Sequence, residues 1–193
     1  MLAPPMRIDE IIERSDEPVF SFEFFPPKTD EGEKNLRATL EALVELEPAF
    51  VSVTYGAGGT TRDRTVELTK WLKQSLGTEA MAHLSCVGAT KAELRTILDG
   101  IAEAGIENVL ALRGDPPRGQ SDWRPHPGGF HYSTELAALI RDSYPFAIGG
   151  ACFPEVHPEA LDMAHDIRFL KEKVDSGVNF LITQLFFDNE LYF

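Results

Sequence analysis

The sequence predicts an α/β protein whose parallel sheet is curled into a (β/α) barrel, and three observations support this. Short apolar segments alternate with amphipathic segments of about 12 to 18 residues, as in successive βα units. Such units give a parallel sheet covered by helices. Polar residues recur near the carboxyl ends of the apolar segments, and in a barrel these ends converge on one mouth. An open doubly wound sheet is the alternative, although no strand is followed by G-x-G-x-x-G.

The expected elements follow from periodicity and from local boundary signals. The strands are Val19–Phe25, Phe50–Tyr55, Ala80–Val87, Asn108–Leu112, Phe146–Cys152 and Phe180–Phe186. The helices are Ile8–Arg14, Asp30–Leu46, Arg62–Leu76, Lys91–Ala104, Ser133–Asp142 and Pro158–Ser176. Thr90 and Glu93 have the spacing of a capping box, and Gly105 and Gly177 follow helices at the C′ position. Pro158 is expected in the first turn of the last helix.

Length and composition limit the class of protein. A chain of 193 residues with 43% hydrophobic residues can form one sizeable domain. The net charge of −13 disfavours a nucleic-acid-binding protein. Cys86 and Cys152 are isolated, which predicts neither disulfides nor a metal site and favours the cytoplasm. No apolar run approaches the roughly 18 residues of a membrane span, and no secretory signal is present.

The number of strands predicts an incomplete barrel. A complete (β/α)₈ barrel typically needs about 250 residues, and the sequence of 193 residues contains six strands. We therefore expect residues 1–193 to form a single catalytic domain that is truncated after the sixth strand. Its sheet would have two open edges, which raises the alternative of a non-catalytic chain that needs a partner.

One carboxylate lies in the apolar segment VFSFEFFPPK. Alternation along the strand places Glu23 on the face that points into the barrel, opposite to Phe22 and Phe24. Burial among aromatic rings would disfavour the carboxylate and let Glu23 hold a proton near neutral pH. This predicts a general acid, and a core acid paired with a nearby Arg or Lys is the alternative.

Other polar residues near the strand ends also have both a functional and a structural interpretation. Asp115 could belong to a simple turn, since GDPP is favourable turn chemistry. Gln184 in an apolar strand needs hydrogen-bond partners if it is buried, and His83 could be a core histidine. Asp166 and Lys173 are seven residues apart and share a helix face, which could equally be a solvated face.

Eight segments resemble the methylenetetrahydrofolate reductase family. In chain order they are SFEFFPPK, FVSVTYGAGG, RDRT, AHLSC, LALRGDPP, FPEVHPEA, KVDSG and ITQLFFD. The resemblance implies a (β/α)₈ barrel that binds FAD and uses NADH or NADPH as co-substrate. It implies reduction of 5,10-methylenetetrahydrofolate to 5-methyltetrahydrofolate by ping-pong hydride transfer through flavin N5, a reaction of one-carbon metabolism and methionine biosynthesis.

The resemblance also implies roles for individual residues. Glu23 would be the general acid, and Asp115 would stabilise a transient cation. Folate would be bound by Asp115, Gln184 and Thr54. Contacts with FAD are implied for Tyr55, Ala57, His83, Arg113, Gly114, Asp115, Tyr132, Ser133, Phe153, His157, Asp166 and Lys173. At position 153 bacterial members commonly have tyrosine, so that hydroxyl is absent here.

Two other readings of the sequence stay open at this point. One is an aldolase- or isomerase-type barrel, although no strand carries an interior lysine for a Schiff base. The other is a non-catalytic, truncated barrel that binds flavin weakly. The expected partner is a small folate molecule, with no nucleic acid and no membrane, and association into a homo-oligomer is left open.

Overall fold

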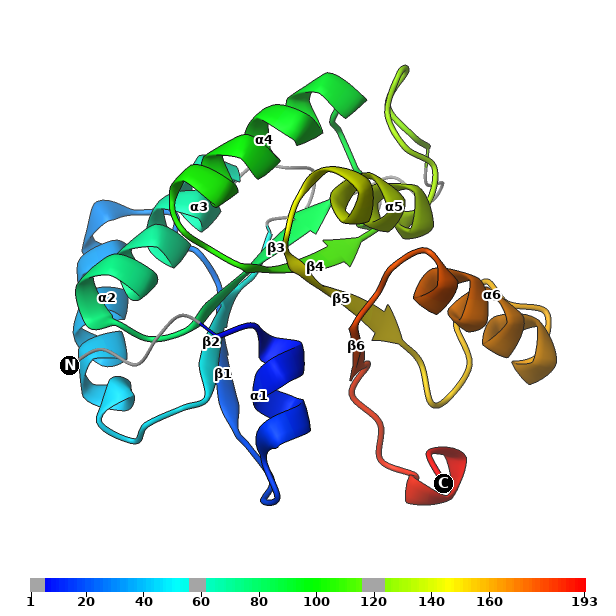
Figure 1. Cartoon of the computed structure of the whole chain (residues 1–193), viewed down its shortest axis with the longest axis horizontal. Helices are drawn as coiled ribbons and strands as arrows, with labels where there is room; N and C mark the ends of the chain where they lie inside the picture. Colours follow the sequence, from blue (N-terminus) through cyan, green and yellow to red (C-terminus); the bar gives the residue numbers. More distant parts are fainter. Residues whose placement is uncertain (1–5, 56–61, 116–123) are drawn as a thin grey trace.

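The computed structural model describes residues 6–55, 62–115 and 124–193, with the backbone alone at 62 and 63. In these residues six parallel strands form one sheet in the order β1-β2-β3-β4-β5-β6. The sheet is curled and carries helices along its outer side (Figure 1). This is the arrangement of six consecutive units of a (β/α)₈ barrel, so the predicted fold class is confirmed. The strands are β1 (Ser21–Phe24), β2 (Phe50–Val53), β3 (Ala80–Ser85), β4 (Asn108–Leu112), β5 (Ala147–Cys152) and β6 (Phe180–Thr183).

Helices alternate with the strands along the chain. They are α1 (Ile8–Arg14), α2 (Asp30–Val44), α3 (Arg62–Trp71), α4 (Lys91–Glu103), α5 (Ser133–Ser143) and α6 (Met163–Asp175). A π-helical turn, η2 (Leu72–Leu76), extends α3, and a short 3₁₀ turn, η3 (Asn189–Leu191), lies near the C-terminus. None of the helices in the described residues combines the length and the apolarity needed to cross a bilayer.

Most boundary signals are confirmed. Thr90 and Glu93 form the capping box at the start of α4, with the Thr90 N–H donating to Glu93 Oε2 at 2.8 Å. Gly105 and Gly177 follow α4 and α6 with φ of +75° and +118°. The expected start of the last helix at Pro158 is wrong, because α6 begins at Met163. There Asp162 accepts from the His165 N–H at 2.7 Å and caps the helix, while residues 154–162 form a loop.

The first and last strands are shorter than predicted because their pairing partners determine where they end. β1 pairs with β2 only over Ser21–Phe24, and β6 pairs with β5 only over Phe180–Thr183. β5 itself ends at Cys152, so the apolar residues after Thr183 leave the sheet. In the described part of the chain, β1 and β6 each have one neighbouring strand.

Two apolar clusters lie between the sheet and its helices, and a third lies on the inner face. Outside, one cluster joins β3–β5 to α4 and α5, and another joins β2 to α2 and α3. Inside, the fully buried Ile8 of α1 packs with Phe50, Met81 and Leu110. These three strand residues therefore show which face of β2, β3 and β4 points into the barrel.

A polar network fixes α1 at the amino-terminal end of the barrel. The side chain of Asn108, at the start of β4, is fully buried and accepts a hydrogen bond from the Ile8 N–H at 2.7 Å. Its Nδ2 donates to Glu79 Oε1 at 2.9 Å, and Lys73 Nζ lies 2.6 Å from Glu79 Oε2. Each of these buried polar groups is satisfied by another, as buried polar groups generally are.

Candidate functional site

The inner face of the sheet brings several of the predicted polar residues to the carboxyl ends of the strands. Ser52 and Thr54 follow Phe50 by even steps, and His83 and Ser85 follow Met81 in the same way, so all four point inward. These four polar side chains are buried. Glu23 pairs in register with Ser52 of the neighbouring strand. The first three strands thus contribute polar groups to one region of the inner face.

Glu23, Ser52 and His83 form a contact group across β1, β2 and β3. Ser52 Oγ donates to Glu23 Oε2 at 3.4 Å, and His83 Nε2 lies 3.4 Å from the same oxygen. In the part of the chain that the structure describes, Glu23 thus contacts Ser52 and His83, and no Arg or Lys forms the ion pair expected of a structural core acid. A carboxyl held between a hydroxyl and an imidazole can take part in proton transfer.

The expected burial of Glu23 among aromatic rings is wrong. Its side chain is 49% exposed. Phe22 and Phe24 alternate with Glu23 and lie on the opposite face, where Phe24 packs against the cluster under α2 and α3. β1 is also an edge strand of the described sheet, which leaves one flank of Glu23 open to solvent.

His83 is the buried member of this group. It is 6% exposed, and burial lowers its pKa to about 4. The imidazole is therefore neutral at physiological pH, and its approach to Glu23 joins a neutral ring to a carboxyl group rather than two ions. Within the described residues its Nε2 has no hydrogen-bond partner of good geometry.

A tight turn after β4 positions Arg113, Gly114 and Asp115. Gly114 has φ of +87°, and a Cβ at this position would lie 2.8 Å from Val87 Cγ1 and 3.0 Å from Ser85 Oγ. Only glycine fits both the backbone conformation and the space. The turn brings the exposed Asp115 close enough to act electrostatically on the Arg113 guanidinium.

Arg113 forms a bidentate ion pair with Glu159 from the loop after β5. The Nη1–Oε2 and Nη2–Oε1 distances are 2.6 and 2.9 Å. The hydrogen bond to Glu159 raises the pKa of Arg113, and the same bond lowers the pKa of Glu159. Glu159 was not identified from the sequence, although it lies in the FPEVHPEA segment.

The same loop and α6 bring Phe153, His157, Asp166 and Lys173 together. The His157 N–H donates to Asp166 Oδ2 at 2.9 Å, and the Phe153 and His157 rings pack edge to face at 4.6 Å between centroids. Lys173 Nζ donates to the Ala151 carbonyl in β5. Burial lowers the pKa of Lys173, partly offset by Cys152 and Asp166. Lys173 therefore faces the sheet, so the alternative of a solvated helix face does not apply to it.

Several other predicted residues are exposed or lie outside the strands. Gln184 follows the end of β6 and is exposed, and its N–H donates to the Cys152 carbonyl at 2.7 Å. Tyr55 packs with the outer cluster under α4 and α5. Tyr132 is 61% exposed, and Ser133 is the first residue of α5. Ala57 lies outside the described residues.

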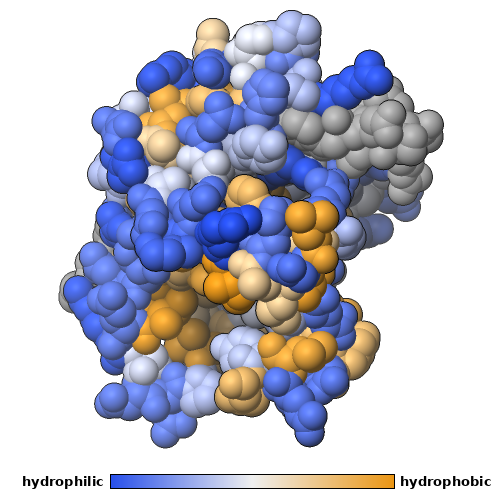
Figure 2. Space-filling model, turned by 90° about the vertical axis from the view of Figure 1, so that its right-hand side faces the viewer, coloured by the Kyte–Doolittle hydropathy of each residue, from blue (hydrophilic) through white to orange (hydrophobic). Residues whose placement is uncertain are grey.

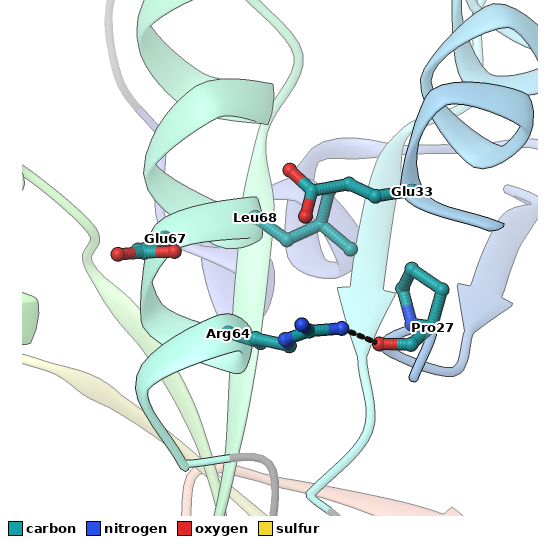
Figure 3. A pocket seen from close by; sticks show the side chains of 5 residues that line it. All are labelled: Pro27, Glu33, Arg64, Glu67 and Leu68. Carbon is teal, nitrogen blue, oxygen red and sulfur yellow. Dashed lines mark hydrogen bonds between the residues drawn. The ribbon is translucent and has the colours of Figure 1, made fainter. Parts of the chain in front are cut away.

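The RDRT segment has a structural explanation. Arg64 in α3 donates to the Pro27 carbonyl and thereby ties α3 to the loop after β1. Thr65 Oγ1 donates to the Thr54 carbonyl at 2.9 Å and holds the end of β2. Figure 3 shows the small pocket between α2 and α3 that Arg64 lines together with Pro27, Glu33, Glu67 and Leu68. None of the predicted site residues lines this pocket.

The side of the molecule that carries α6 and the C-terminus is hollowed, and apolar residues gather around the hollow (Figure 2). Exposed apolar side chains in α6 and after β6 include Ile167, Leu185 and Phe187. This side of the molecule therefore presents apolar side chains to solvent.

Comparison with protein families gives one family over nearly the whole chain. The family described as methylenetetrahydrofolate reductase matches residues 7–193. The 5,10-methylenetetrahydrofolate reductase of Salmonella typhimurium is 46% identical over 172 residues, which cover 89% of this chain and 56% of that protein. Methylenetetrahydrofolate reductase (NADH) 1 of Zea mays is 38% identical over 198 residues, covering 96% of this chain and 33% of that protein. The chain thus spans about half the length of the bacterial relative.

Solved structures share the fold at low identity. An uncharacterised protein from Clostridium thermocellum that binds two copies of 5-methyl-5,6,7,8-tetrahydrofolic acid aligns with a TM-score of 0.59 at 17% identity, covering 94% of this chain and 59% of that chain. Oxaloacetate acetylhydrolase aligns with a TM-score of 0.65 at 10% identity, covering 96% and 65%. At such identities these likenesses concern the fold alone.

Proposed function

Because the chain belongs to the methylenetetrahydrofolate reductase family, we propose that its inner face takes part in the reduction of 5,10-methylenetetrahydrofolate to 5-methyltetrahydrofolate. The observation that carries this proposal is the Glu23–Ser52–His83 group at the carboxyl ends of the first three strands. A proton donor at this place is what the reaction requires, and barrel enzymes build their active sites at this end.

Glu23 is the proposed general acid. Its carboxyl proton goes to N10 of the folate, the C–N10 bond of the five-membered ring breaks, and a cation is left at N5. FAD, when bound, would supply the hydride for this cation, with NADH or NADPH as the source of its electrons. The partial exposure of Glu23 lets solvent return the proton for the next turnover.

Asp115, Thr54 and Gln184 are the proposed folate residues. The Asp115 carboxylate follows the turn after β4, where its negative charge favours a cation nearby. Thr54 is buried on the inner face two residues after Ser52. The exposed amide of Gln184 has both a donor and an acceptor for the edge of a pterin ring.

The residues after β4 and β5 fit a bound FAD. Arg113 and Lys173 are close enough to interact electrostatically, which suits an anion such as a diphosphate. Gly114 gives the turn the conformation that presents Arg113 and Asp115. Proposed contacts with FAD come from Tyr55, Ala57, His83, Arg113, Gly114, Asp115, Tyr132, Ser133, Phe153, His157, Asp166 and Lys173.

The test is a pair of half-reactions on the purified chain titrated with FAD. We expect a yellow complex whose flavin bands are bleached anaerobically by NADH or NADPH and restored by methylenetetrahydrofolate. E23Q should keep the first half-reaction and slow the second by about 10²–10⁴-fold, the usual contribution of a general acid. E67Q, on the outer helix α3, is the matched control.

A folded chain that stays colourless would contradict the proposal. Flavin binding without either half-reaction would support the cofactor assignment alone and favour the non-catalytic alternative. This outcome has to be tested because the chain spans only about half the length of the bacterial relative. Cys86 and Cys152 are free thiols, so a reducing cytoplasm is the compartment we propose.

A further inference from the structure

His83 Nε2 is a buried polar atom whose geometry needs an explanation. It is fully shielded from solvent and has no well-formed hydrogen bond to the described residues. Buried polar atoms without partners are costly, typically by about 1–3 kcal/mol, and those that persist often mark functional sites. Glu23 Oε2 lies 3.4 Å from it.

The surroundings keep this imidazole uncharged. Its inward neighbours are Glu23 from β1, Ser52 from β2 and Leu110, its register partner in β4. Glu23 is the one carboxyl group among them, and burial lowers the pKa of His83. An Arg or Lys here would hold Glu23 as a permanent carboxylate, whereas a neutral ring does not.

We propose that His83 is a positioning residue for Glu23: its neutral imidazole holds the carboxyl group through Nε2 and leaves Glu23 free to give up and regain its proton. In both states the ring hydrogen is on Nε2 and is directed to Glu23 Oε2. When Glu23 is protonated, its proton is on the other carboxyl oxygen, from which it can be given up. The ring therefore keeps its one hydrogen and takes no net proton.

This inference rests on the proposed function for the role of Glu23, but the contact itself can be measured without flavin or folate. The experiment is ¹⁵N NMR of the imidazoles in the purified chain between pH 5.5 and 8. H83Q assigns the signal by its loss, and E23A removes the carboxyl partner. We expect a neutral His83 throughout, with an Nε2 signal that moves in E23A but not in H126Q, a variant of an exposed loop histidine.

An imidazolium form of His83 at pH 7, or an Nε2 signal unchanged by E23A, would overturn the proposal. These outcomes are independent of catalysis, so they remain decisive even if the half-reactions fail and the proposed function with them.

The functional readout is the folate half-reaction in H83Q and H83L, which have side chains of related size with and without a hydrogen-bonding group. We expect H83L to slow this half-reaction about tenfold, the loss of one hydrogen bond, and H83Q to recover most of that loss. Because His83 is also a proposed FAD contact, the two half-reactions are compared at saturating FAD, where H83L should slow the folate half-reaction more than the flavin-reduction half-reaction. Equal losses in H83Q and H83L, or equal losses in both half-reactions, would show a structural or flavin-contact role and refute the proposal.

Discussion

Gly114 should be the least replaceable of the glycines around the candidate site, and Gly114→Ala tests this. Gly114 follows Arg113 in the turn after β4, and its φ of +87° lies in the left-handed region. An alanine there would strain the backbone by about 1–2 kcal/mol. Its Cβ would also lie 2.8 Å from Val87 Cγ1, and overpacking of this kind costs about 1–3 kcal/mol. The expected loss in free energy of unfolding is the sum, about 2–5 kcal/mol.

Two other glycines separate these contributions. Gly105 has φ of +75° but open space around a Cβ, so G105A should cost only the backbone strain, about 1–2 kcal/mol. Gly100 lies within α4 with nothing near a Cβ, so G100A should stabilise the chain by about 0.5–1 kcal/mol. V87A removes the atom that Gly114→Ala would touch.

The assay is urea unfolding of the four variants and of the double variant G114A/V87A, with free energies from linear extrapolation. We expect the double variant to be more stable than the sum of its parts predicts, by about 0.5–3 kcal/mol, because the two positions share one contact. A G114A cost that equals the G105A cost, together with additive effects in the double variant, would refute the packing argument.

Three further predictions concern buried polar groups. The pKa of His83 is about 4 in the folded chain against an ordinary 6.5, so below pH 6.5 the unfolded chain binds a proton that the folded chain does not. Lowering the pH from 7.5 to 5 should therefore destabilise the wild type by about 2 kcal/mol more than H83Q, and equal pH dependence in urea unfolding would contradict this. Burial raises the pKa of the Cys86 thiol to about 12 and also raises the pKa of Cys152, but only Cys152 is partly accessible. Maleimide at pH 8 should therefore label Cys152 and not Cys86 in the native chain, and rapid labelling of native C152S would contradict this. N108A should lower the free energy of unfolding by about 2–4 kcal/mol, because two buried partners lose their hydrogen bonds, whereas the exposed control N35A should have little effect.

The alternation of apolar and amphipathic segments was enough to predict the fold, because each unit pairs with the next along the chain. The largest errors in strand length occur at the edges of the sheet. Phe180–Phe186 is a mostly apolar segment, but the strand ends at Thr183 because β5 offers no further backbone partner. A strand end depends on its neighbour, and a single run of residues does not contain that information.

The candidate site was predictable in its position but not in its environment. Glu23 was predicted to point inward, and it does contact Ser52 and His83. Its burial was inferred from phenylalanines that are adjacent in sequence, yet these side chains alternate to the other face. Neighbours along a strand are not neighbours in space.

Partners far apart in sequence were missed altogether. The Arg113–Glu159 pair joins residues 46 positions apart, and Arg64 reaches a carbonyl 37 positions away. Charged and polar residues at such separations have many candidate partners, so only three-dimensional structure selects among them. Glu159 could have been suspected only because it lies in the same segment as His157.

The hydrogen bond that attaches α1 has a consequence for the order in which the chain assembles. Every strand pairs with the strand made just before it, so most of the sheet can form progressively during synthesis. Helix α1 is the exception, because the partner of the Ile8 N–H is a side chain 100 residues later. Until β4 has been synthesised, α1 lacks this buried partner, so the amino-terminal end of the barrel can close only after β4 has formed.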